Sequence, residues 1–121
     1  MNSSILVSAD KLKKNIFKKK ILNEIINDNL YKINNLIDNN YKNNKEQLVT
    51  NLPISFNIPD TINHKEFLLE VYYNLIEILE KKGYKINIRI KENETLLKIN
   101  WRSSDDSNLD MMKKKLKDII F

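Results

Sequence analysis

The sequence predicts one small α+β domain in which a long N-terminal helix precedes a β-α-β-β-α segment. Apolar residues recur at three- and four-residue spacing over 22–41, and apolar and polar residues alternate over 48–58 and 84–101. With 121 residues, 41% hydrophobic and 31% charged, the chain can bury a single core. We therefore divide it into a basic N-terminal arm, 1–20, and a single α+β domain, 21–121.

The first helix is predicted over 22–41 because its apolar residues form one stripe that faces a partner: Leu22, Ile25, Ile26, Leu30, Ile33, Leu36, Ile37 and Tyr41. Upstream, Leu12 and Ile16 fall off this stripe, and six Lys against one Asp make the arm strongly basic. We expect the arm to form a bent or separate helix. The asparagine-rich segment 39–44 is where the first helix should end, since Asn competes for backbone hydrogen bonds.

Residues 48–58 predict a half-buried strand, with Leu48, Leu52 and Phe56 among the residues of inward parity. Pro53 cannot donate to a ladder of backbone hydrogen bonds. The strand should therefore begin near Pro53 or lie at a sheet edge with that position facing outward.

The second helix has marked ends. Asn63 and Glu66 form a capping box, and Ile62 with Phe67 fits a hydrophobic staple. Gly83, the only glycine, stands where a helix needs a left-handed C′ residue. Its predicted apolar face consists of Leu68, Val71, Tyr72, Leu75, Ile78 and Leu79.

Two alternating stretches, 84–91 and 95–101, predict a hairpin. Pairing Ile90 with Thr95 sets Lys91 against Glu94, whereas a two-residue slip would oppose Arg89 and Lys98, so we prefer the first register. The same register sets Tyr84 against Trp101, both with inward parity. A final helix should follow a cap at Ser107 and Asp110, with Leu109, Met112, Leu116, Ile119 and Ile120 on one face.

A right-handed crossover makes the first strand parallel to the second and leaves a gap for the third. This predicts a three-stranded mixed sheet in the order first-third-second, a ferredoxin-like half with helices on one face. The opposite face should be polar and basic: Asn51, Ser55, Asn57, Lys85, Asn87, Arg89, Lys91, Lys98 and Asn100. The first strand has no outer neighbour, so the N-terminal helix or another copy must cover its edge. The candidate self-association residues are Leu22, Ile26, Leu30, Ile33, Ile37, Tyr41, Ile54 and Phe56.

The composition argues against catalysis. With one glycine, one histidine and no cysteine, the chain lacks phosphate-binding glycine loops, thiolate nucleophiles and sulfur-based zinc sites. We interpret His64 as a surface residue, and Asp105, Asp106 and Asp110 as helix-capping residues; the alternative for these carboxylates is Mg²⁺ binding. We expect no catalytic or metal-binding residue, no cofactor and no small-molecule substrate.

The basic charge leaves two interpretations open. The 19 lysines reflect a partner, or they reflect AT-rich coding that also favours the 18 isoleucines and 19 asparagines. If the partner is a nucleic acid, contacts should be to phosphates, because the aromatic residues of the strands have inward parity. The candidate nucleic-acid-binding residues are Lys11, Lys13, Lys14, Lys18, Lys85, Arg89, Lys91 and Lys98.

Three short segments carry a resemblance over slightly under half of the chain: Leu52-Pro53, the helix end Leu79-Glu-Lys-Lys-Gly83-Tyr84, and Leu97-Lys-Ile99-Asn-Trp101. They resemble small proteins of large nucleocytoplasmic DNA viruses, the mimivirus-like giant viruses. The resemblance implies a virion, a viral factory or the host cytoplasm as the setting, and no activity or catalytic residue. The absence of cysteine fits an intracellular location, and no stretch approaches the ~20 apolar residues of a membrane span.

These observations favour a non-enzymatic interaction or assembly protein that forms a homo-oligomer, with a viral structural role implied by the resemblance. The alternative is a nucleic-acid-binding module that contacts phosphates through the basic arm and the basic sheet face.

Overall fold

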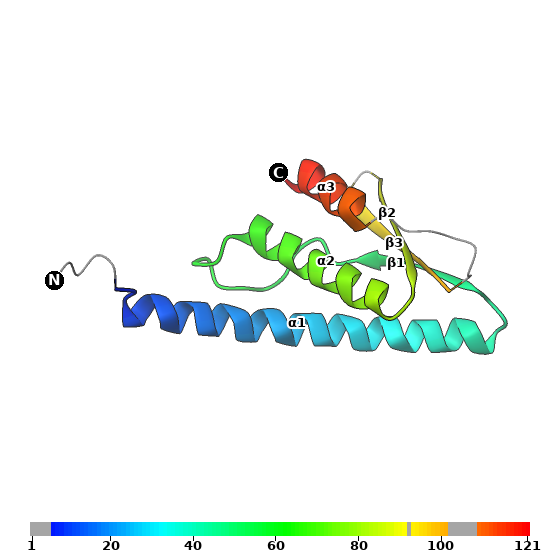
Figure 1. The fold of residues 1–121 in the computed structure, drawn as a ribbon, viewed down its shortest axis with the longest axis horizontal. Coiled ribbons are helices and arrows are strands. Elements are labelled where there is room, and N and C mark those ends of the chain that lie inside the picture. Colours follow the sequence, from blue (N-terminus) through cyan, green and yellow to red (C-terminus); the bar gives the residue numbers. More distant parts are fainter. Residues whose placement is uncertain (1–5, 92, 102–108) are drawn as a thin grey trace.

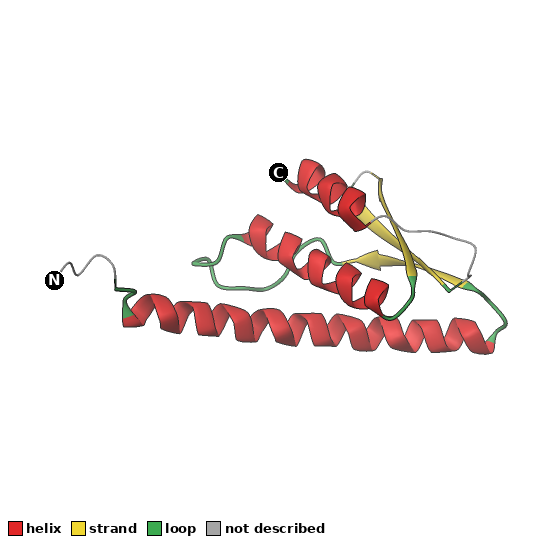
Figure 2. Ribbon diagram, in the orientation of Figure 1, coloured by secondary structure: helices red, strands yellow, loops and turns green. Residues whose placement is uncertain are grey.

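The computed structural model describes residues 6–91, 93–101 and 109–121. Within them, α1 spans Ala9–Lys42, β1 Gln47–Leu52, α2 His64–Lys81, β2 Lys85–Lys91, β3 Glu94–Asn100 and α3 Leu109–Ile120. The three helices lie side by side in the order α1, α2, α3, and the sheet lies behind α2 (Figures 1 and 2). The α+β prediction and its element order are confirmed.

The sheet has the predicted order, β1-β3-β2. The hairpin register is also confirmed, with Ile90 opposite Thr95 and Lys91 opposite Glu94. The description of the sheet as mixed is wrong, because both neighbouring pairs are antiparallel. β1 and β2 do run in the same direction, as the crossover rule requires, but β3 lies between them.

β1 is shorter than predicted because it ends at Leu52, directly before Pro53, where a ladder loses its next donor. The apolar residues beyond it pack from a loop. Ile58 is buried, and the Phe56 ring meets the Phe67 ring edge-on at a centroid distance of 5.9 Å. The alternation over 54–58 therefore reflects packing of the loop against the core and does not indicate a strand. Ser55 and Asn57 consequently do not belong to the sheet face on which we placed them.

α1 is one continuous helix of 34 residues, and it crosses the boundary at residue 20 without a break. The expectation of a bent or separate helix over the arm is wrong. Ser8 caps its first turn, where the side-chain oxygen accepts a hydrogen bond from the Lys11 amide at 3.2 Å. The helix ends within the asparagine-rich segment, at Lys42, as predicted.

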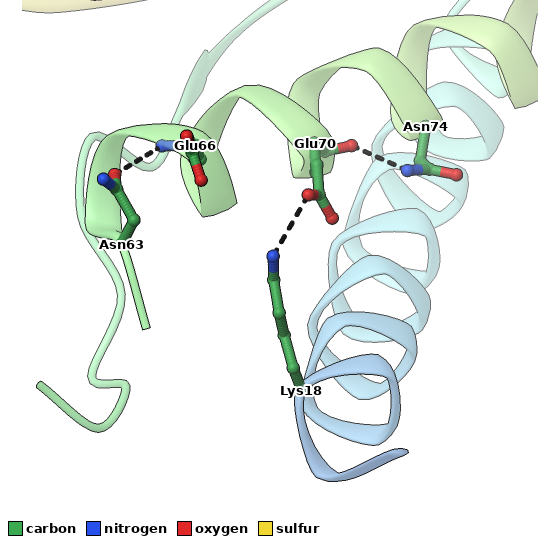
Figure 3. Close-up of polar contacts among 5 residues, drawn as sticks. All are labelled: Lys18, Asn63, Glu66, Glu70 and Asn74. Atoms are coloured by element: carbon green, nitrogen blue, oxygen red, sulfur yellow. Dashed lines mark hydrogen bonds and ion pairs between the residues drawn. The ribbon is translucent and has the colours of Figure 1, made fainter. Parts of the chain in front are cut away.

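Both ends of α2 follow the prediction. The Asn63 side chain accepts a hydrogen bond from the Glu66 amide at 3.1 Å (Figure 3). At the other end, Gly83 has a φ of +95°, and the Tyr84 amide donates back to the Leu79 carbonyl at 3.2 Å. This is a Schellman motif, which turns the chain from α2 into β2.

The core lies between α2 and the sheet, and α1 and α3 close its two sides. Phe67, Val71, Leu75 and Ile76 of α2 are fully buried. They share one cluster with buried residues of the other elements: Ile26, Ile33, Ile37, Leu48, Leu52, Ile86, Ile88, Leu97, Ile99, Met112 and Leu116. Alternate residues of each strand thus face the helices, which leaves the other face of the sheet without a helix.

Candidate functional site

The outer edge of β1 is the first candidate site. The Trp101 amide donates to the Glu46 carbonyl at 3.1 Å, so the backbone of residue 46 faces β3. Backbone groups alternate in direction along a strand, and those of Gln47, Val49 and Asn51 therefore face outward. Among the described residues, α1 covers this edge at one point, where the Asn40 side-chain amide donates to the Gln47 carbonyl at 3.0 Å.

The β1 edge carries no charged side chain, since its sequence is Gln-Leu-Val-Thr-Asn-Leu. Val49 is 55% exposed, although it is a good strand former at the middle of the strand. A surface hollow of about 820 Å³ lies along the first half of this edge, between the end of α1 and the strand; it is lined by Asn40, Asn44, Lys45, Glu46, Gln47, Leu48 and Val49. The edge is thus neutral and accessible, a combination that natural sheets usually avoid.

The other sheet edge, at β2, differs. α3 lies beside it, and Lys115 donates a hydrogen bond from Nζ to the Ile88 carbonyl at 2.9 Å. β2 also carries Lys85, Arg89 and Lys91, and charged side chains of this kind discourage edge pairing.

The face of the sheet that no helix covers is the second candidate site, and we call it the open face. Its residues follow from the register and are mostly polar: Gln47, Val49, Asn51, Lys85, Asn87, Arg89, Lys91, Glu94, Leu96, Lys98 and Asn100. A shallow hollow of about 260 Å³ crosses all three strands and is lined by Gln47, Val49, Asn87, Arg89, Leu96 and Lys98. The predicted basic sheet face therefore exists over the strands themselves, with four cationic side chains.

The structure separates the two groups of candidate nucleic-acid-binding residues. Lys11, Lys13 and Lys14 are exposed on the first turns of α1, which lie at the end of the molecule far from most of the sheet (Figure 1). Lys18 is engaged within the chain, since its Nζ lies 3.3 Å from Oε1 of Glu70 on α2 (Figure 3). Lys85, Arg89, Lys91 and Lys98 lie together on the open face.

The candidate self-association residues are divided as well. Ile26, Ile33 and Ile37 are buried in the core of their own chain, and Leu22, Leu30 and Phe56 pack partly against it. The partner that the apolar stripe faces is therefore within the same domain, and the three buried side chains are not available to another copy. Tyr41 and Ile54 are exposed, at 67% and 56%.

Residues considered for catalysis lie apart from any pocket described above. The His64 ring is half exposed, with Nε2 3.9 Å from Oδ1 of Asp60. Within the described residues, no group of three His, Cys, Asp or Glu side chains is placed to hold a metal ion. Asp105, Asp106 and the cap at Ser107 lie outside the described residues, and the structure does not describe the side chain of Asp110.

Sequence reasoning missed one hollow, where α1 meets the ends of β2 and β3. The Tyr84 and Trp101 rings meet edge-on there, with centroids 6.4 Å apart. They have the predicted inward parity, but each is only half buried and lines a hollow of about 340 Å³ with Asn34, Ile37, Asp38 and Tyr41. Asp38 accepts a hydrogen bond from Lys42 at 2.8 Å, which raises the pKa of the Lys42 amine. This carboxylate is thus already neutralised by its neighbour.

None of the helices that the structure describes has the length and apolar character needed to cross a bilayer.

Comparison of this chain with models of known protein families, with curated proteins and with solved structures finds no match.

Proposed function

We propose that this protein is a non-enzymatic assembly module that pairs with a second copy of itself through the β1 edge. The observation that carries the proposal is the neutral, accessible β1 edge beside a β2 edge that is charged and occupied by Lys115. Outward-facing amides and carbonyls of an edge strand are ready partners for another strand.

An antiparallel pairing about a two-fold axis fits this edge. With the axis at Val49, the two Val49 residues would lie opposite each other, and each Gln47 would lie opposite an Asn51 of the other copy. The pairing opposes an apolar side chain to itself and amides to amides, so no like charges meet across it. Pro53 limits the ladder to the length of β1, because it has no N–H to donate.

Six residues of strand bury less surface than a standard interface, and we therefore expect a dissociation constant on the order of 10 µM. The resemblance to giant-virus proteins supports a virion or a viral factory as the setting, in which a high local concentration favours such pairing.

The test is sedimentation velocity at concentrations on either side of the expected dissociation constant. The wild type should shift from monomer to dimer, and Val49→Lys should stay monomeric because two ammonium groups would then oppose each other across the axis. Ile54→Lys is the matched control: its side chain is 56% exposed, it adds the same charge, and it lies outside the strand.

Hydrogen exchange of the wild type gives a second measurement without any substitution. The Val49 and Asn51 amides should become protected as protein concentration rises, while the amides of exposed loops should not change. A wild type that stays monomeric at the highest concentration, or a Val49→Lys variant that still dimerises, would contradict the proposal.

A further inference from the structure

The open face gathers cationic side chains from two neighbouring strands. Lys85, Arg89 and Lys91 follow one another along β2, and Lys98 of β3 lies opposite Asn87. Lys98 is therefore the diagonal neighbour of both Lys85 and Arg89, at about 7–8 Å between backbone positions. Because a strand rises about 3.3 Å per residue, the four charges lie within a stripe roughly 20 Å long.

These four charges are not neutralised within the part of the chain that the structure describes. Ion pairs engage Lys18, Lys42 and Lys113 on the helices, but none engages a cation of the open face. The face bears one carboxylate, Glu94, at the end of the hairpin opposite Lys91. Like charges this close repel one another, and a polyanion would relieve that repulsion.

The chemistry between the cations also suits phosphate. The shallow hollow over the strands places the Arg89 and Lys98 side chains beside the amides of Gln47 and Asn87. A guanidinium group can donate two parallel hydrogen bonds to a phosphate, and ammonium and amide groups add donors to phosphate and sugar oxygens.

Two features decide between possible polyanions. Val49 is the one large apolar side chain listed as exposed on this face, among the described residues, so the face offers little to insert into a lipid surface. Tyr84 and Trp101 face the helices, and so the open face has no aromatic ring on which a base could stack. Both features favour a nucleic acid that is bound by its backbone.

We propose that the open face binds the phosphate backbone of a nucleic acid, without sequence preference, through Lys85, Arg89, Lys91 and Lys98. Each copy of the chain carries the whole face, so this binding does not depend on pairing through the β1 edge. If all four cations contact phosphates of a duplex, the logarithm of the binding constant should fall with the logarithm of salt concentration with a slope of about −3.6.

The test uses fluorescence anisotropy with a labelled duplex DNA about two helical turns long, titrated over a series of salt concentrations. The test variant replaces Lys85, Arg89, Lys91 and Lys98 by Gln. The matched control replaces Lys11, Lys13, Lys14 and Lys19 by Gln; these are exposed on α1, and the loss of charge is the same. We expect the test variant to lose at least about tenfold in affinity at low salt and most of the salt slope, and the control to keep both.

A titration of the isotope-labelled wild type with the same duplex keeps the proposal testable if the variant fails to fold. Amide shifts should concentrate on β2, on β3 and around Val49. Equal losses in the two variants, a loss confined to the α1 variant, or binding to phosphatidylserine vesicles without binding to the duplex would each overturn the proposal.

Discussion

The ammonium group of Lys115, on α3, lies 2.9 Å from the backbone carbonyl oxygen of Ile88 in β2 and donates a hydrogen bond to it. This bond ties the last helix to the outer edge of the sheet, while Met112 and Leu116 on the same helix are buried in the core. α3 therefore does for β2 what no described element does for most of β1.

Replacing Lys115 by Met should lower the free energy of unfolding by about 1 kcal/mol, because the edge carbonyl loses a charged donor while the aliphatic stem is kept. Urea unfolding followed by circular dichroism measures this change. Lys114→Met is the control, since Lys114 is an exposed neighbour for which no hydrogen bond is described. Equal stability of the two variants would show that the bond contributes nothing.

Tyr72 should make stability depend on pH in the alkaline range. Burial raises the pKa of its hydroxyl above the usual 10.0, although a hydrogen bond with Thr95 opposes the shift. The folded state thus holds the phenolic proton more tightly than the unfolded state does. This contribution is fully present below pH 10 and is lost as pH rises through the raised pKa.

Tyr72→Phe should remove that loss and flatten the pH dependence of urea unfolding above pH 10. At neutral pH the variant should be less stable by about 1 kcal/mol, because the Tyr72 hydroxyl donates to the Pro53 carbonyl in the wild type. Tyr31→Phe is the control, as the Tyr31 side chain is 70% exposed. A wild type and a Tyr72→Phe variant with parallel alkaline profiles would contradict the prediction.

Gly83→Ala should destabilise the protein through its backbone alone. The φ of +95° disfavours any side chain, whereas an added Cβ would have no heavy atom within 4 Å. We expect a loss of about 1–2 kcal/mol in thermal or urea unfolding. Lys82→Ala, at the preceding right-handed position, should change stability little. A loss in Gly83→Ala no larger than in Lys82→Ala would mean that α2 and β2 can be joined by another turn.

Local signals in the sequence were enough for the hairpin and for α2. Opposed charges at Lys91 and Glu94 fix a register when only a short turn separates the strands, and Asn63 and Gly83 mark helix ends within a few residues. Pro53 was ambiguous, because a proline ends or begins a strand equally well and the following loop imitates alternation by packing Phe56 and Ile58 inward.

Signals that depend on distant packing were interpreted less well. The stripe on α1 indicates a buried face but not whether the covering surface belongs to the same chain, and here the chain's own core covers Ile26 and Ile33. Leu12 and Ile16 suggested a separate arm because they leave the stripe, yet a lysine-rich segment can continue a helix beyond the core with no apolar face to bury. The long distance between the two groups of lysines follows from this straight helix, and no local pattern records it.

The inequality of the two sheet edges limits how far strand pairing can extend. A sheet whose two edges were both open could add copies at each end and grow into a fibre. Here one edge is neutral and accessible, and the other carries cations and the Lys115 contact. Growth by this route would therefore stop at two copies, which leaves a closed, countable unit and protects a lysine- and isoleucine-rich chain from aggregation.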